Sequence, residues 1–162
     1  FLIVGVLYER RHTRLIAEFG GLSSRMPIYA AVFLIIAMSS IGLPGLNGFV
    51  GEFMILMGTF PVSWVWTAVA ATGIVLGAGY MLWLYQRVMF GKLEKSANLA
   101  LKDLSFREFA VFLPLVLLAF WIGIYPKPFL TLIEKPVEKI ARIVNPGLFA
   151  PKADRLPAAE VR

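Results

Sequence analysis

The 162-residue sequence has no cysteine, a single histidine and few charges. Without cysteine, no disulfide, iron–sulfur cluster or thiolate-bound metal can belong to this chain. His12 lies in a charged segment and cannot form a metal cluster alone. Charged residues make up 16% and hydrophobic residues 59% of the chain, far from the balance of a soluble domain. The composition indicates an all-helical integral membrane protein with no room for a sizeable soluble domain.

The signatures of self-contained enzymes are also missing. No glycine-rich phosphate loop follows a strand, no nucleophile stands beside a base, and no quinone or flavin motif is visible. The net charge of +6 could indicate nucleic-acid binding, but the basic residues border apolar segments, as a membrane topology signal does. We therefore expect no cofactor in this chain and no nucleic-acid partner.

What the sequence does contain is a long apolar segment, residues 28–60, broken in its middle. A straight helix of that length would span about 50 Å, against about 30 Å of hydrocarbon. Pro44 removes a backbone donor, and the neighbouring glycines, Gly42, Gly45 and Gly48, disfavour helix. The pattern predicts two half-helices, 28–41 and 48–60, joined by an unwound linker.

One carboxylate, Glu52, follows the break. Unwound backbone within a membrane needs protein or a water-filled cavity around it, and an acid there is a candidate for function. We expect Glu52 in the first turn of the second half-helix, where burial opposes its charge and the helix dipole favours it. That balance suits a proton relay, whereas the alternative is a structural acid bonded to a neighbouring helix. Ser39 and Ser40 are expected to bond carbonyls that the break sets free.

Other segments complete a polytopic bundle. We predict a transmembrane region over residues 1–128, followed by an amphipathic helix and an irregular tail over 129–162, with Pro136 interrupting or beginning that helix. The first residues are apolar with no initiator methionine, so we interpret the chain as part of a longer protein whose first helix is incomplete. The expected spans are 1–8, 28–60 with a break near 42–47, 62–90 and 106–125.

The charges between these spans predict an orientation. Basic residues concentrate in the segments 9–26 and 87–107, whereas the short connection 58–66 has none. Both basic segments then lie on one side, which should be the cytoplasmic one. We interpret Glu108, beside Arg107, as a solvated charge at the mouth of the last span.

The stretch from Ser40 to Phe53, SIGLPGLNGFVGEF, resembles the broken twelfth helix of the antiporter-like membrane subunits of respiratory complex I, NADH:quinone oxidoreductase. Residues 7–14, 20–22 and 90–92 are similar to that family as well, so the resemblance covers most of residues 1–128. Glu52 favours one subtype, because sister chains usually carry lysine at that position.

The resemblance implies the C-terminal part of a fourteen-helix antiporter-like fold, with Glu52 as the terminal residue of a proton path. It implies a non-redox, proton-translocating subunit of NADH:quinone oxidoreductase in a bacterial inner membrane or an equivalent energy-coupling membrane. Its partners would be other membrane subunits, sister antiporter-like subunits among them, and lipid. NADH, FMN, iron–sulfur clusters and quinone would bind elsewhere in the complex.

Two other interpretations stay open. Related folds occur in multisubunit sodium/proton antiporters and membrane-bound hydrogenases, and kinship of fold alone does not choose among these functions. A subunit that only packs against its neighbours, with an inert Glu52, is the third interpretation. Companion subunits that carry flavin and iron–sulfur clusters would favour the NADH:quinone oxidoreductase subunit, and their absence would favour the antiporter.

Overall fold

The computed structural model describes residues 1–144, and the irregular tail expected beyond them lies outside this part of the chain. In the described part, all regular structure is helical. The helices are α1 (Leu2–Arg11), α2 (Pro27–Ile41), α3 (Asn47–Thr59), α4 (Trp64–Met89), the short α5 (Ser96–Leu99), α6 (Phe106–Ile124) and α7 (Lys127–Val144), with two 3₁₀ turns, η1 (Ile16–Glu18) and η2 (Leu22–Ser24).

The chain divides into two compact units. The first is Phe1–Ile124 and the second begins at Tyr125, a few residues before the limit of 128 expected from the sequence. The difference arises because α6 ends at Ile124 and α7 already begins at Lys127. The helical membrane fold with a broken helix is thus contained in the first unit.

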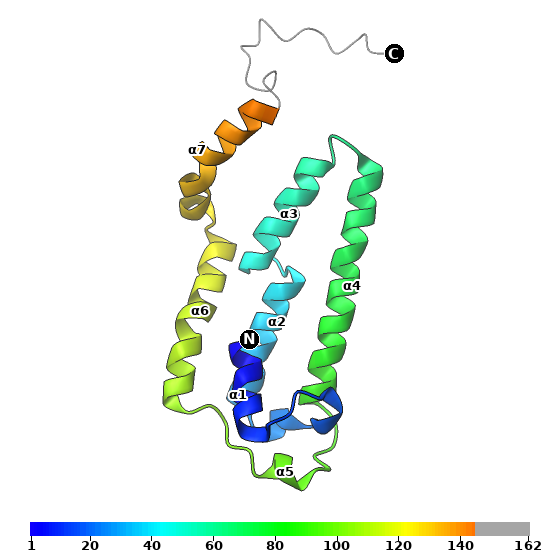
Figure 1. The fold of residues 1–162 in the computed structure, drawn as a ribbon, viewed down its shortest axis with the longest axis vertical. Helices are drawn as coiled ribbons and strands as arrows, with labels where there is room; N and C mark the ends of the chain where they lie inside the picture. The colour runs from blue at the N-terminus through cyan, green and yellow to red at the C-terminus, as the bar shows by residue number, and fades with distance from the viewer. Residues whose placement is uncertain (145–162) are drawn as a thin grey trace, which may run out of the picture. The chain divides into compact units, whose positions relative to one another are not determined.

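The broken helix forms the centre of the first unit. In Figure 1, α2 and α3 follow one another, and α4 runs beside both on one side. Helix α6 contacts α2 and α3 as well. The best-buried side chains gather where α1, η2, α2 and α4 meet, among them Leu22, Met26, Tyr29 and Met89. The Tyr29 hydroxyl donates to the carbonyl of Ile3 at 2.9 Å, which fixes α1 against α2.

Local sequence explains where two of these helices begin. Pro27 is the first residue of α2, a position whose backbone N–H would have no partner within the helix. Ser63 precedes α4, and its hydroxyl accepts a hydrogen bond from the N–H of Trp66 at 3.4 Å.

Helices α4 and α6 are long and apolar enough to cross a membrane, with mean hydropathies of 1.6 and 1.9. A core helix of a soluble protein would be mostly buried, but the apolar window of α4 is 0% buried and that of α6 is 11% buried. Such surfaces require lipid or neighbouring protein around them. Helix α2 is apolar but shorter.

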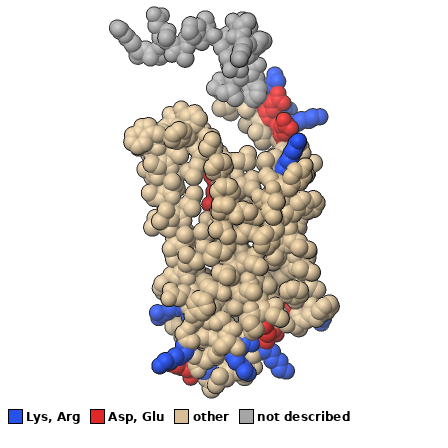
Figure 2. All heavy atoms as spheres, turned by 180° about the vertical axis from the view of Figure 1, so that it is seen from behind, with Lys and Arg blue, Asp and Glu red and all other residues tan. Residues whose placement is uncertain are grey.

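Lysine and arginine side chains of the first unit gather at one end (Figure 2). The segments 9–26 and 87–105 meet there, since Lys95 Nζ donates to the carbonyl of Ala17 at 2.9 Å and Asn98 Nδ2 to that of Glu18 at 3.0 Å. Gly21 adopts φ 66° and lies so close to Gly91 and Leu93 that a Cβ would not fit. The shared end is observed, and the cytoplasmic side stays a prediction.

Glu108 is not the solvated charge that the sequence suggested. Both its carboxylate oxygens accept from Arg10 Nη2, at 2.8 and 2.7 Å, and one also accepts from the backbone N–H of Ser105. Ser105 Oγ in turn accepts from the N–H of Glu108, a capping box at the start of α6. The expectation was wrong because Arg10 is distant in sequence and close only in the fold.

Asp103 caps a helix from which it is far away in the chain. Its two carboxylate oxygens accept from the backbone N–H groups of Ile28 and Tyr29, at 2.8 and 3.0 Å, in the first turn of α2. Arg10 Nη1 and Nη2 donate to the carbonyls of Lys102 and Asp103. The connection between α5 and α6 therefore holds the start of α2 through these bonds.

We expect Asp103→Ala to destabilise the protein by about 1 kcal/mol, because the first-turn N–H groups of α2 lose their acceptors. Heat unfolding of the purified protein in detergent measures this loss. Lys102→Ala is the matched control, since Lys102 is exposed and its backbone carbonyl, the group that Arg10 contacts, is retained. Equal stability of the two variants would contradict the capping role.

Helix α7, in the second unit, runs through Pro136 without interruption, contrary to the expected break there. A proline removes one N–H, so the carbonyl of Leu132, four residues earlier, loses its partner within the helix. The apolar residues of α7 share one face and its lysines and arginine the other. Placement of this helix at a membrane interface stays a prediction.

Candidate functional site

The centre of the candidate site is the break between α2 and α3. Helix α2 ends in a Schellman motif, in which the N–H of Gly42 bonds the carbonyl of Ser39 at 3.2 Å and that of Leu43 bonds Met38 at 3.0 Å. Gly42 has φ 83°, a left-handed conformation that is unfavourable for any residue with a Cβ atom. Glycine at this position therefore ends the helix.

A tight turn crosses the break. The N–H of Leu46 bonds the carbonyl of Leu43 at 3.1 Å, with Pro44 and Gly45 between them. Gly45 has φ 93°, as the third residue of a type II turn requires, and proline is favoured immediately before it. The sequence Pro-Gly thus turns the chain and leaves residues 42–46 outside both helices.

Ser39 connects the two half-helices. Ser39 is a buried residue, and its hydroxyl donates a hydrogen bond to Oδ1 of Asn47, the first residue of α3. The sequence suggested a bond to a freed carbonyl, but the acceptor is a side chain across the break. Gly48 lies against the carbonyl of Ser39 so closely that a Cβ would overlap it. A hydroxyl and a glycine therefore hold the end of α2 to the start of α3.

Glu52 lies in the second turn of α3, not in the first, since α3 begins at Asn47. The expected contribution of the helix dipole is correspondingly weaker, because that effect falls off within the first turn. Side chains of a helix lean toward its N-terminus, and the Glu52 carboxylate occupies the place that a Cβ on Gly42 would take. The carboxylate thus lies directly at the break.

Glu52 has no polar partner within the described part of the chain. Glu52 is partly buried, and among residues 1–144 its carboxylate has neither a hydrogen bond nor an ion pair. An ionisable side chain within an apolar bundle is by default a candidate for function. Two of the predicted glycines make close contacts in the fold, Gly42 with the carboxylate of Glu52 and Gly48 with the carbonyl of Ser39.

One residue at the break was missed by reasoning from the sequence. Gly123, in the last turn of α6, lies against Gly45 and Leu46, and a Cβ there would overlap the carbonyl of Gly45 and the nitrogen of Leu46. No local pattern singles it out, because a glycine near the end of an apolar helix is common. Beside it, an apolar groove of about 280 Å³ is lined by Leu34, Ile35, Met38, Leu43, Pro44, Gly45, Leu46, Phe120 and Ile124.

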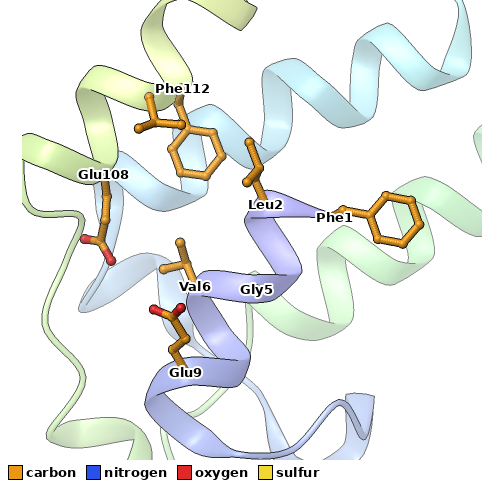
Figure 3. A pocket seen from close by; sticks show the side chains of 8 residues that line it. Phe1, Leu2, Gly5, Val6, Glu9, Glu108 and Phe112 are labelled. Atoms are coloured by element: carbon orange, nitrogen blue, oxygen red, sulfur yellow. The ribbon is translucent and has the colours of Figure 1, made fainter.

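A second hollow lies between α1 and α6, away from the break. Figure 3 shows Glu9 and Glu108 at one end of this cavity of about 350 Å³, and Leu2 and Phe112 at the other. Glu108 is already paired with Arg10. The remaining walls are mostly apolar, so the cavity offers a packing surface and no group of reactive residues.

The described residues, 1–144, hold no group of three histidine, aspartate or glutamate side chains that could bind a metal ion. The ionisable side chain at the break is Glu52, a carboxylate that can exchange a proton or form an ion pair. Both need a route to water or to another ionisable group.

Comparisons with known proteins relate the break to a family. Residues 1–77 match the family model described as NADH:quinone oxidoreductase/Mrp antiporter, TM. NADH-quinone oxidoreductase subunit M of Rhodobacter capsulatus is 51% identical over 127 residues, which are 78% of this chain and 25% of that protein. NADH-ubiquinone oxidoreductase chain 4 of Marchantia polymorpha is 42% identical over 142 residues, 88% of this chain and 29% of that protein.

A solved structure agrees with these relatives. A chain in the respiratory complex I of Thermus thermophilus with bound NADH matches with a TM-score of 0.72 and 35% identity, over 79% of this chain and 27% of that one. The chain therefore spans between a quarter and three tenths of the length of the proteins that it matches.

Proposed function

We propose that this chain belongs to the family of antiporter-like membrane subunits of NADH:quinone oxidoreductase and acts as the C-terminal part of a proton-translocating subunit M, or chain 4. It carries out no redox chemistry itself. NADH, FMN, iron–sulfur clusters and quinone bind to other parts of the complex, and the other membrane subunits, sister antiporter-like subunits among them, and lipid surround it. The complex lies in a bacterial inner membrane or an equivalent energy-coupling membrane.

The observation that supports this function most directly is the position of Glu52. Its carboxylate lies at the break, against Gly42, and has no partner among the described residues. Opening or closing of the break changes the surroundings of that carboxylate and hence its affinity for a proton. Glu52 is the proton-carrying residue of this chain. The break around it is shaped by Gly42, Pro44, Gly45 and Gly48. Redox reactions elsewhere in the complex drive the opening and closing of the break.

A sodium/proton antiporter subunit is the second candidate, because the family model covers Mrp antiporters as well as the oxidoreductase. The relatives described above favour the oxidoreductase, since both are named as its subunits and are 51% and 42% identical to this chain. In the antiporter, an ion gradient instead of redox reactions would drive proton transfer at the same carboxylate.

Affinity purification of the full-length protein from its own membranes separates the two candidates. We expect the purified complex to contain flavin and iron–sulfur clusters and to oxidise NADH with quinone. In membrane vesicles, loss of this subunit should abolish most NADH-driven acidification. A purified complex without redox centres that exchanges sodium for protons would overturn the proposal in favour of the antiporter.

A further inference from the structure

Helix α6 is held at both of its ends. At its start, Glu108 pairs with Arg10 of α1 and closes a capping box with Ser105. At its end, Gly123 touches the backbone of the break at Gly45 and Leu46. Between these points α6 contacts both α2 and α3. The position of α6 along the bundle is therefore fixed against the break itself.

The contact at Gly123 is of an unusual kind. The atoms that a Cβ on residue 123 would meet are a carbonyl carbon, a carbonyl oxygen and an amide nitrogen, and not the end of a flexible side chain. Backbone atoms cannot turn aside as side chains do, so any side chain at position 123 must displace the turn at residues 43–46 or push α6 away. By contrast, Gly73 and Gly77 of α4 have no atom within 4 Å of such a Cβ.

The turn that Gly123 touches is linked to Glu52 by close approaches. Three residues before Gly45, Gly42 lies against the Glu52 carboxylate, and Gly48, three residues after it, lies against Ser39. A displacement of Gly45 and Leu46 therefore changes the space left for the carboxylate. We infer that Gly123 is a positioning residue for proton transfer at Glu52, setting the shape of the break from outside the broken helix. This inference rests on the proposed function of Glu52.

The test replaces Gly123 by alanine in the full-length protein within its assembled complex. Infrared difference spectra identify the carboxyl band of Glu52 as the band that Glu52→Gln removes. We expect Gly123→Ala to shift the frequency of this band and to slow proton translocation by roughly tenfold, as a small misplacement of a reacting group does. Gly73→Ala adds the same methyl group where space is open, and should leave the band frequency and the rate of proton translocation unchanged.

A second variant keeps the test decisive where Gly123→Ala does not assemble. Phe120→Leu removes a ring from the groove beside Pro44 and Gly45 and adds no atom to the contact. It should shift the Glu52 band in an assembled complex. An unshifted band in assembled Gly123→Ala, or in Phe120→Leu where the first variant is lost, overturns the inference.

The two proposals fail in different ways. Normal pumping in Glu52→Gln would refute the proton-carrying role, yet the band shift would still show whether Gly123 shapes the surroundings of Glu52. Conversely, loss of pumping in Glu52→Gln with an unshifted band in Gly123→Ala would refute only the role of Gly123.

Discussion

Replacement of Glu52 by glutamine is expected to reduce proton translocation per electron several-fold, while the complex assembles at a near-normal level. Glutamine keeps the shape of the side chain and can still donate and accept hydrogen bonds, but it cannot release a proton at physiological pH. The fold should tolerate the change, because the Glu52 carboxylate makes no ion pair within the described residues that the substitution would break. The measurement is acidification of membrane vesicles per NADH oxidised, alongside the amount of assembled complex.

Two further variants make this result specific to the carboxyl group. Glu52→Asp keeps an ionisable group on a shorter stem and should retain more activity than Glu52→Gln. Glu94→Gln is the matched control, an exposed glutamate at the basic end of the first unit, and should pump normally. A structural acid at position 52 predicts the opposite order, with assembly lost first and the remaining complexes pumping at full stoichiometry.

The break could be predicted from the sequence because local chemistry decides it. Proline followed by glycine, here Pro44 and Gly45, favours a type II turn, and Gly42 ends a helix through its left-handed conformation. The excess length of segment 28–60 adds an independent reason. These rules placed the end of α2 at residue 41, as observed, and the start of α3 at residue 48, one residue after Asn47.

Contacts between distant residues could not be predicted in the same way. Arg10 and Glu108 are 98 residues apart, and Ile28 and Asp103 are 75 apart, so no periodic pattern links them. Gly123 carries no local signal either, because its importance derives from the backbone of another segment. The break itself thus follows from the sequence and the role of Glu52 stays a prediction, whereas the contact of α6 with the break is visible only in the fold.

A glycine can be needed for its backbone freedom or for the space that it leaves, and Gly48 distinguishes these reasons. It lies within α3, where alanine is the better helix former by about 1 kcal/mol. A Cβ at Gly48 would overlap the carbonyl of Ser39 in the last turn of α2, whereas a Cβ at Gly51 would meet nothing within 4 Å. The same substitution in one helix therefore meets two different surroundings.

We expect Gly48→Ala to destabilise the protein by about 1–3 kcal/mol, because the two half-helices must separate to admit the methyl group. Gly51→Ala should be neutral or slightly stabilising, because helix propensity then acts alone. Heat unfolding of the purified protein in detergent, with both variants measured side by side, gives the difference.

Separation of the half-helices should also break the bond from Ser39 to Asn47, so Ser39→Ala should cost much less in the Gly48→Ala background than alone. Full additivity of the two substitutions would show that Gly48 does not hold the break through Ser39.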